Sequence, residues 1–330
     1  MFPSSTQRKH WMLGSEAKVI DRRLKAYNDF IARFSYDKSQ SAKYLAFEES
    51  ELILRFFEKK LADFCNKFRP HMPRNVFGTA LQYFRRFYLS NSVMDYHPKE
   101  ILVTAAYLAC KAEEFNVTME QFVANINGNK ERATEIILNH ELLLMEQLNF
   151  HITVHNPWRP VEGLIIDIKT RLLPDLPVQM DVEKFRSEIE KFLDEAVALT
   201  NASLIYAPSQ IALAAVIHGA SKNGHNLDKY VTEILFVGEK DDLIKEEKLR
   251  KIIEAVRNIR VMVKNIDWTE ISTTEIKKLF QELEKCRNQD NNPDGQAYKR
   301  KIQDLLEDED ERGGVNAKMA RYDSSVSVLE

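Results

Sequence analysis

The chain has 330 residues, of which 44% are hydrophobic and 29% are charged, and its formal net charge is −3. Only ten glycines and ten prolines occur, which argues against an all-β protein because such folds need many tight turns. Residues 287–330 hold seven basic and ten acidic side chains, so 40 of the 47 basic and 40 of the 50 acidic residues belong to the body. A neutral body argues against a protein that binds nucleic acid through charge.

The amino-terminal residues 1–13 are polar and lack the apolar run of a signal peptide, and no long uncharged stretch follows them. We therefore expect a soluble intracellular protein with no membrane partner. We also expect these residues to form a mobile arm in which Trp11 is an anchoring point. Ser5, close to Arg8 and Lys9, is a candidate phosphorylation site, and an unmodified arm is the alternative.

A surface helix is predicted from Ser15, a good N-cap, to Phe34. One stripe of this helix is apolar and is expected to be buried, with the charged residues facing solvent. The apolar stripe is Ile20, Leu24, Tyr27, Ile31 and Phe34, and the charged face is Arg22, Arg23, Lys25 and Asp29.

Five helical segments are predicted after this helix. Each of the longer ones carries apolar residues at helical spacing, and a capping box, Thr118 to Gln121, opens the short fourth one. Arg85 and Arg86 lie between the aromatic residues of the second segment and are expected to be solvated. The segments cover about residues 53–68, 76–87, 98–112, 118–126 and 130–148.

The third segment is unusual because Ile101–Cys110 has no charge on any face. A helix that is apolar all round lies inside a protein core or a bilayer, and ten uncharged residues are too few to span about 30 Å of hydrocarbon. This segment therefore predicts a central helix wrapped by others. Lys111, Glu113 and Glu114 follow it directly, so charged side chains meet the rim of the core there.

The same pattern returns 110 residues later. Tyr, Pro, Ile and Ala in Tyr96-His-Pro98-Lys-Glu-Ile101-Leu-Val-Thr-Ala105 recur at the same offsets in Tyr206-Ala-Pro208-Ser-Gln-Ile211-Ala-Leu-Ala-Ala215. We therefore predict an all-α protein with two copies of a five-helix unit and one further helix at each end. The expected divisions are an amino-terminal arm and helix (1–46), a first unit (47–158), a second unit (159–266), and a carboxy-terminal helix with a disordered charged tail that starts at Arg287 (267–330).

No motif for catalysis or cofactor binding stands out. The chain has no glycine-rich phosphate loop, no nucleophile elbow and no CxxC pair, and its three cysteines are expected to be reduced core thiols. His151 and His155 are four residues apart, but their surroundings are not helical and lack the glutamate of a metalloprotease. We expect no metal site and no cofactor.

Lys111 and Glu141 each lie among apolar residues, where an ordinary solvated face explains them poorly. One interpretation is that they pair with each other or extend their polar ends to solvent. The other is that the lysine supplies donors, and the glutamate an acceptor, to the backbone of a partner. The residues alone leave both interpretations open.

Several stretches resemble the cyclin family, including YFRRFYL (83–89), LACKAEEF (108–115), ELLLMEQLNFHITVHNPWRP (141–160) and YAPSQIAL (206–213). The likeness covers about residues 5–265 and is to the members that activate cyclin-dependent kinase 7. It implies two tandem five-helix cyclin boxes and a regulatory subunit with no catalytic residue of its own. In the family, the counterparts of Lys111 and Glu141 hydrogen-bond the kinase beside its αC helix. The resemblance also implies that the contact is lined by Ala112, Glu114, Phe115, Met145, Phe150 and Ile152.

The resemblance further implies a set of partners and a place in the cell. These partners are a cyclin-dependent kinase 7-like kinase, a RING-finger assembly factor of the CDK-activating kinase, and the core of transcription factor IIH, with nuclear localisation and no direct contact with nucleic acid. The substrate-docking patch of the cell-cycle cyclins has no match in Glu51-Leu-Ile-Leu-Arg55, so recruitment of substrates through that patch is not expected. The alternative is a DNA-binding general transcription factor with a double cyclin fold, which would show a basic face and usually a zinc ribbon.

Overall fold

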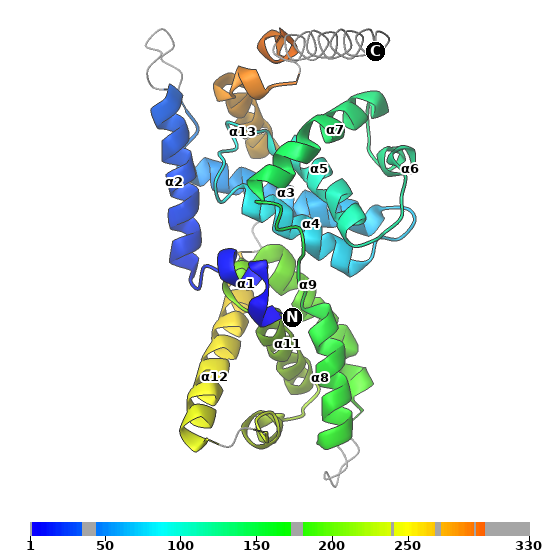
Figure 1. The fold of residues 1–330 in the computed structure, drawn as a ribbon, viewed down its shortest axis with the longest axis vertical. Coiled ribbons are helices and arrows are strands. Elements are labelled where there is room, and N and C mark those ends of the chain that lie inside the picture. Colours follow the sequence, from blue (N-terminus) through cyan, green and yellow to red (C-terminus); the bar gives the residue numbers. More distant parts are fainter. Residues whose placement is uncertain are drawn as a thin grey trace, which may run out of the picture.

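The computed structural model describes residues 2–34, 44–172, 181–238, 241–267, 272–293 and 295–300. Within these ranges all regular structure is helical, so the predicted all-α class is confirmed. Two groups of helices are stacked along the long axis of the molecule, and α2 (Glu16–Phe34) stands at the side of the upper group (Figure 1).

The first group has a buried helix at its centre. It contains α3 (Phe47–Lys67), α4 (Arg74–Phe87), α5 (Pro98–Ala112), α6 (Met119–Ala124) and α7 (Lys130–Gln147). α5 packs against α3, α4 and α7. Ala105, Ala106 and Ala109 are fully buried, and their small side chains let these neighbours approach closely. The predicted central helix is therefore confirmed.

Short polar signals set where these helices begin. The hydroxyl of Thr118 accepts a hydrogen bond from the backbone amide of Gln121, and the side-chain oxygen of Gln121 accepts one from the backbone amide of Thr118, which confirms the predicted capping box. α5 begins with Pro98, where a missing amide hydrogen costs least, and Nδ1 of His97 accepts from the Lys99 amide at 3.1 Å.

The second group repeats the first. It contains α8 (Trp158–Arg171), η3 (Val182–Phe185), α9 (Arg186–Leu199), α10 (Ala202–Ile205), α11 (Pro208–Lys222), η4 (Tyr230–Ile234) and α12 (Asp242–Lys264). α11 packs against α8, α9 and α12, as α5 packs against α3, α4 and α7. Both α5 and α11 have 15 residues, and their first prolines are 110 positions apart. The predicted duplication is therefore present in the fold.

The amino-terminal arm is packed on the body, which corrects the prediction that it is mobile. It forms η1 (Phe2–Ser4) and α1 (Thr6–His10), and Trp11, predicted to be an anchor, is only 5% exposed. Trp11 donates its indole N–H to Nδ1 of His151 at 3.1 Å. Nε2 of Gln7 donates to the carbonyl of His155, and Oε1 of Gln7 accepts from the backbone amide of His155. These partners are about 140 residues away, so no local pattern could indicate them.

α2 forms over the expected residues, but its buried face only partly matches the predicted stripe, of which Tyr27, Ile31 and Phe34 are partly buried against the core. Val19, Arg23, Ala26 and Phe30 are buried, whereas Ile20 and Leu24 are 42% and 38% exposed. The expectation that Arg23 faces solvent is therefore wrong. Its guanidinium meets the carboxylate of Glu51 on α3 at 2.7 Å, and this long-range ion pair sets how the helix is turned.

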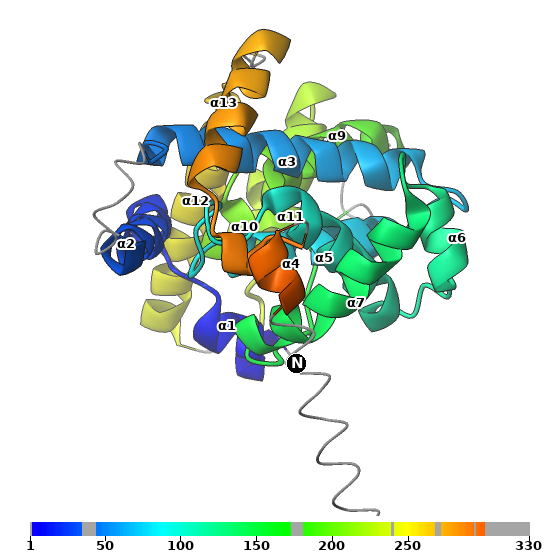
Figure 2. The same cartoon turned by 90° about the horizontal axis from the view of Figure 1, so that it is seen from above.

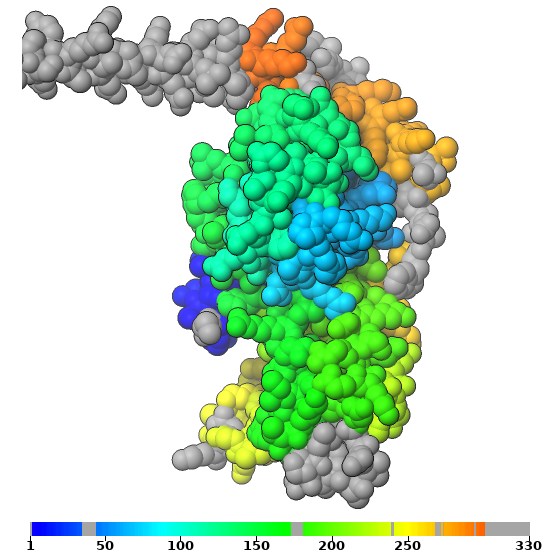
Figure 3. Space-filling model, turned by 90° about the vertical axis from the view of Figure 1, so that its right-hand side faces the viewer, coloured from blue at the N-terminus to red at the C-terminus, as the bar shows by residue number. Residues whose placement is uncertain are grey.

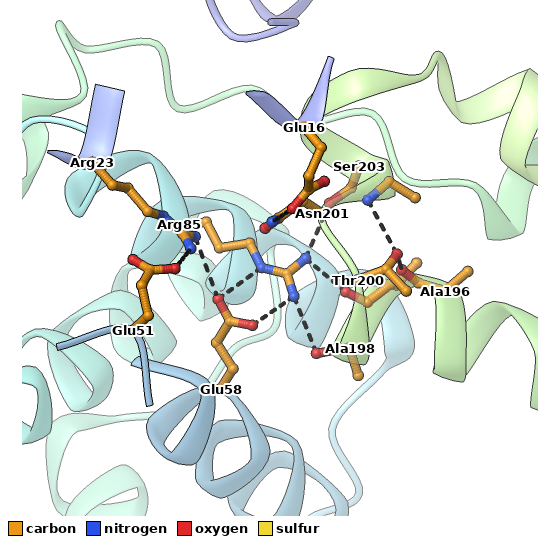
Figure 4. Close-up of polar contacts among 12 residues, drawn as sticks. Glu16, Arg23, Glu51, Glu58, Arg85, Ala196, Ala198, Thr200, Asn201 and Ser203 are labelled. Carbon is orange, nitrogen blue, oxygen red and sulfur yellow. Dashed lines mark hydrogen bonds and ion pairs between the residues drawn. The ribbon is translucent and has the colours of Figure 1, made fainter. Parts of the chain in front are cut away.

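Arg85 is buried, so the prediction that it is solvated is wrong. Its guanidinium meets both carboxylate oxygens of Glu58 at 3.0 and 2.7 Å and donates to the carbonyls of Val197 and Ala198 at 2.7 and 3.1 Å (Figure 4). Glu58 belongs to the first group of helices and Val197 to the second. One buried cation therefore joins the two groups.

Arg86 is also buried, again against the prediction. Its guanidinium lies 5.2 Å from the centre of the Trp11 ring and donates to the carbonyl of His151 at 3.3 Å. Burial lowers the pKa of Arg86 to about 10. The aromatic arm thus covers a cation that the sequence places between core residues.

The carboxy-terminal helix α13 (Thr273–Cys286) crosses α3 (Figure 2), where Phe280 meets Phe56 with ring centres 5.4 Å apart. The prediction that a disordered tail starts at Arg287 is wrong at its boundary. Arg287 is buried and pairs with Glu100 at 2.7 Å. After η5 (Gln289–Asn291) the chain is described as far as Arg300, and the rest of the predicted tail, residues 301–330, lies outside the described residues.

In the described ranges, no helix has both the length and the hydropathy needed to cross a membrane. All three cysteines are buried and unpaired, as predicted.

Candidate functional site

Two helix ends in the first group carry unusual backbone. After α5, Glu114 has φ of 55°, and after α7, Asn149 and Phe150 have φ of 50° and 57°. In each case an amide bonds a carbonyl five residues back at 2.9 Å, from Phe115 to Cys110 and from Phe150 to Met145. Among the described residues these three are the only non-glycine residues with positive φ. Such strain persists where the surrounding structure enforces it, and it is typical of binding sites.

The turn after α11 in the second group can be compared with the turn after α5. The position 110 residues after Glu114 is Gly224, with φ of 75°, and the His225 amide bonds the Ala220 carbonyl at 2.9 Å. The same turn therefore closes α11, but with a residue that adopts positive φ without steric cost. The first group keeps a side chain at a position where glycine would fit better.

Lys111 and Glu141 join the two helices beside these turns. The ammonium nitrogen of Lys111 meets a carboxylate oxygen of Glu141 at 2.5 Å and lies 5.3 Å from the centre of the Tyr107 ring. The Lys111 side chain is 52% exposed and that of Glu141 is 18% exposed. Of the two interpretations of these residues, pairing with each other is observed. It leaves two ammonium hydrogens and one carboxylate oxygen available to a partner.

The other predicted site residues lie around this pair. Ala112, Glu114 and Phe150 are exposed, and Phe115, Met145 and Ile152 are half-buried. Ala112, Glu114 and Phe115 follow Lys111 along the chain, and Met145, Phe150 and Ile152 follow Glu141, so the eight predicted residues lie on the carboxy-terminal halves of α5 and α7 and on the segments after them, joined by the Lys111–Glu141 pair. α6 and α7 form the upper part of the face seen in Figure 3.

Two apolar residues of this surface were missed by the sequence analysis. Leu138 and Leu142 on α7 are 58% and 60% exposed, and Phe150 is 58% exposed. The buried face of α7 is Ile137, His140 and Leu144, so both leucines lie off it. A contiguous exposed apolar surface on a soluble protein marks an interaction site. The available signal was that α7 has apolar residues on two faces.

The segment that carries Phe150 and Ile152 is held from beneath. The hydroxyl of Tyr83 donates to the carbonyl of Ile152, and burial raises the pKa of that hydroxyl. Arg86 and Trp11 hold the backbone and the side chain of His151. The packed arm and α4 therefore give this surface a fixed shape.

No metal site is formed by His151 and His155 with other ligands from the described part of the chain. Nδ1 of His151 is occupied by the Trp11 indole, and its ring stacks on His10 at 4.9 Å. Among the described residues there is no group of three or more His, Cys, Asp or Glu side chains placed to hold a metal ion. Ser5 is the N-cap of α1, where its hydroxyl accepts from the Arg8 amide at 3.3 Å. Its phosphorylation stays a prediction.

The sequence of the chain matches two known domain families. The cyclin N-terminal domain matches residues 40–153, and the cyclin C-terminal domain matches residues 156–264. Cyclin-H of Xenopus laevis is 41% identical over 294 residues, which are 87% of each chain. Cyclin-H1-1 of Arabidopsis thaliana is 32% identical over 247 residues, 74% of this chain and 69% of the relative.

Solved structures share the fold. A chain of the CAK complex from Chaetomium thermophilum bound to ATP-γ-S aligns with a TM-score of 0.76 and 22% identity, covering 95% of this chain and 96% of that one. A chain of the yeast TFIIK (Kin28/Ccl1/Tfb3) complex aligns with a TM-score of 0.55 and 23% identity, covering 79% and 99%. The matches to both cyclin domains and to several cyclin-H sequences show that this chain belongs to the cyclin family, in its cyclin H branch.

Proposed function

We propose that this chain is the regulatory subunit that binds and activates a kinase of the cyclin-dependent kinase 7 type. Its membership of the cyclin H branch supports this function, and the surface around Lys111 and Glu141 provides the contact. The two boxes are taken as residues 47–158 and 159–266, and the contact belongs to the first. The chain supplies no catalytic residue, and the phosphoryl transfer is carried out by the kinase.

Activation follows from the fixed shape of this surface. A protein kinase is active only when the αC glutamate pairs with the β3 lysine and the activation loop is correctly placed. A rigid surface that binds αC in its inward position shifts the kinase toward the active state by its difference in affinity for the two states. Leu138, Leu142 and Phe150 supply apolar area for a helix, while Lys111 and Glu141 supply donors and an acceptor for backbone at its end.

One observation carries the proposal. The Lys111–Glu141 pair, the residues with positive φ at 114, 149 and 150, and exposed Phe150 lie on the last turns of α5 and α7 or directly after them, and the exposed Leu138 and Leu142 lie on the middle turns of α7. Strained backbone and exposed apolar area each reduce the stability of the free chain. Their coincidence with a polar pair fits a surface kept for a partner.

The test is the double substitution Lys111→Ala with Glu141→Ala in the full chain. We expect activation of the kinase at near-stoichiometric concentration to fall about thirtyfold or more, because charged hydrogen-bonded pairs in a contact are worth about 2–5 kcal/mol. The matched control is Lys169→Ala with Glu183→Ala, which removes an ion pair of the same 2.5 Å length from the second group. Circular dichroism checks that both variants are folded. Equal activation by the two variants would contradict the assignment.

The proposal also covers the other partners of the chain, the substrates of the assembled kinase and its place in the cell. We take the partners to include a RING-finger assembly factor and the core of transcription factor IIH. The assembled kinase would phosphorylate the activation loops of other cyclin-dependent kinases and the RNA polymerase II C-terminal domain, in the nucleus. Affinity capture from nuclear extract followed by mass spectrometry tests these partners. Tight, salt-sensitive binding to DNA in a gel-shift assay would support the rival DNA-binding factor instead.

A further inference from the structure

The described chain ends on the outer side of α7. Residues 296–300 form a helical turn whose Tyr298 is half-buried. The Tyr298 hydroxyl interacts with the side chain of Asn139, and Glu135 and Arg132 lie near it. Burial, with Glu135, raises the pKa of this hydroxyl. Tyr298 therefore fixes the start of the following segment to the middle of α7.

The two exposed leucines of α7 lie next to this attachment. Leu138 and Leu142 are four residues apart, so they form one ridge on the helix surface. Asn139 and Leu142 are three residues apart, which places their Cβ atoms about 5–6 Å from each other. The ridge is therefore within one helical turn of Tyr298, and the described residues leave more than half of each leucine exposed.

The sequence after Arg300 has the composition to cover this ridge. Ile302, Leu305 and Leu306 have the spacing of one helix face, and the acidic run Glu307–Glu311 follows at once. Leu305 is seven residues after Tyr298, a distance of about 10 Å as helix and at most about 25 Å when extended. Either conformation reaches Leu142. Residues 301–330 lie outside the described part of the chain.

The charges on both sides are complementary. The basic triplet Lys299–Lys301 follows Tyr298 in the sequence, and Tyr298 lies near Glu135, an exposed residue of α7 that also pairs with Arg132 at 2.6 Å. In the sequence, the acidic run comes after the apolar residues. On the surface, Lys111 lies beyond the ridge: its ammonium nitrogen contacts Glu141, and half of its side chain is exposed. A segment laid across the ridge would bring the basic triplet near Glu135 and the acidic run near Lys111.

We infer that Ile302–Leu306 docks on the Leu138–Leu142 ridge, with the acidic run against Lys111, so that the chain covers its own kinase-binding surface when no kinase is bound. The competition with the kinase rests on the proposed function, whereas the docking does not. The kinase must displace the segment, and its apparent affinity is reduced by the fraction of chains with a free ridge. Because the contact is small and intramolecular, we expect a three- to tenfold reduction.

The docking is tested without kinase by methyl NMR on the full chain with labelled leucines. Leu305→Glu with Leu306→Glu should shift the methyl resonances of Leu138 and Leu142 and leave Leu243, on α12, unchanged. The control, Val326→Glu with Val328→Glu, adds the same charge to the same tail and should shift none of them. Unchanged Leu138 and Leu142 resonances would overturn the inference. Shifts that disappear on tenfold dilution would also overturn it, because the segment would then dock on a second copy.

The competition is tested by titrating kinase into the same variants. We expect Leu305→Glu with Leu306→Glu to bind kinase three to ten times more tightly than the unsubstituted chain and the control. Shifted methyl resonances with unchanged kinase affinity would overturn the competition. If neither the unsubstituted chain nor any variant binds kinase, the proposed function is contradicted. The methyl resonances then still show whether the segment docks on the ridge.

Discussion

At the scale of single residues, buried charges determine how the parts of this protein are joined. Arg85 reaches from α4 to the carboxylate of Glu58 and to carbonyls at the end of α9. Burial alone raises the pKa of Glu58, but the charge and hydrogen bonds of Arg85, with Arg23, lower it overall. In the sequence, an arginine between aromatic residues at helical spacing has no sign of burial, because its partners are on other helices. The buried contacts of Arg85 could therefore be identified only from the three-dimensional structure.

We predict that Arg85→Met destabilises the chain by about 3–5 kcal/mol, because it leaves the Glu58 carboxylate buried with its nearest remaining cation, Arg23, 3.9 Å away. The matched variant is Arg74→Ala, also on α4 and also paired with α9, through Glu190 and Asp194. That pair is exposed, so its loss should cost less than about 1 kcal/mol. Urea denaturation at neutral pH measures both. Equal destabilisation by the two substitutions would show that Arg85 is not the main buried link.

Stability should also depend on pH through His97. Burial, and then Arg287 and Lys99, lower the pKa of His97 to about 3, and half-exposed Glu284, 3.6 Å away, does not offset this. An unfolded histidine has a pKa of about 6.5, so between pH 6.5 and 3 only the unfolded chain binds this proton. The contribution of His97 is therefore complete above pH 6.5 and falls as the pH drops, by about 1.4 kcal/mol per pH unit.

His97→Asn keeps a side-chain acceptor for the Lys99 amide and removes the titrating group. We predict that its free energy of unfolding falls less steeply between pH 6.5 and 4.5 than that of the unsubstituted chain. His97→Ala removes the cap as well and should add a loss of about 1 kcal/mol at every pH. Urea denaturation at a series of pH values gives the slopes. Parallel slopes for the unsubstituted chain and His97→Asn would contradict this account.

At the scale of elements, the sequence was sufficient to predict where the helices form but not which face each helix buries. Periodicity and capping residues are local, so α5, α6 and α11 begin where the sequence indicated. The face that a helix buries depends on its neighbours. α2 has an apolar stripe, yet it buries Arg23 because Glu51 and Glu58 lie beneath it. For the same reason the exposed leucines of α7 were missed.

The turn after α5 gives a prediction at this scale. Glu114→Gly should stabilise the free chain by about 1 kcal/mol, because it relieves positive φ at a position where the second group has Gly224. It should also weaken kinase activation, since the exposed Glu114 side chain is part of the proposed contact. The matched variant Gly224→Ala should lose about 1 kcal/mol and leave activation unchanged. Thermal denaturation and kinase assays measure both effects. Lower stability of Glu114→Gly would show that the turn is not strained.

At the scale of the whole molecule, the two copies share a fold and differ in surface. The resemblance in the sequence named residues expected to contact a kinase, and the structure places them on α5, on α7 and on the segments that follow these helices; their contact with a kinase stays a prediction. The packing of the arm could not be predicted from the sequence, because it joins residues 140 and 148 positions apart. Within the described residues, strained non-glycine backbone occurs only in the first copy. The second copy contacts the first through Arg85, and α13 contacts it through Phe280.

The central claim is that a kinase is bound by the first copy, at the ends of α5 and α7. Hydrogen exchange of the full chain, with and without saturating kinase, tests it most directly. We predict slower exchange on binding for the backbone amides of residues 111–116 and 149–154, and unchanged exchange for residues 221–226, the equivalent turn after α11. Protection confined to the second copy, with residues 111–116 and 149–154 unaffected, would contradict it.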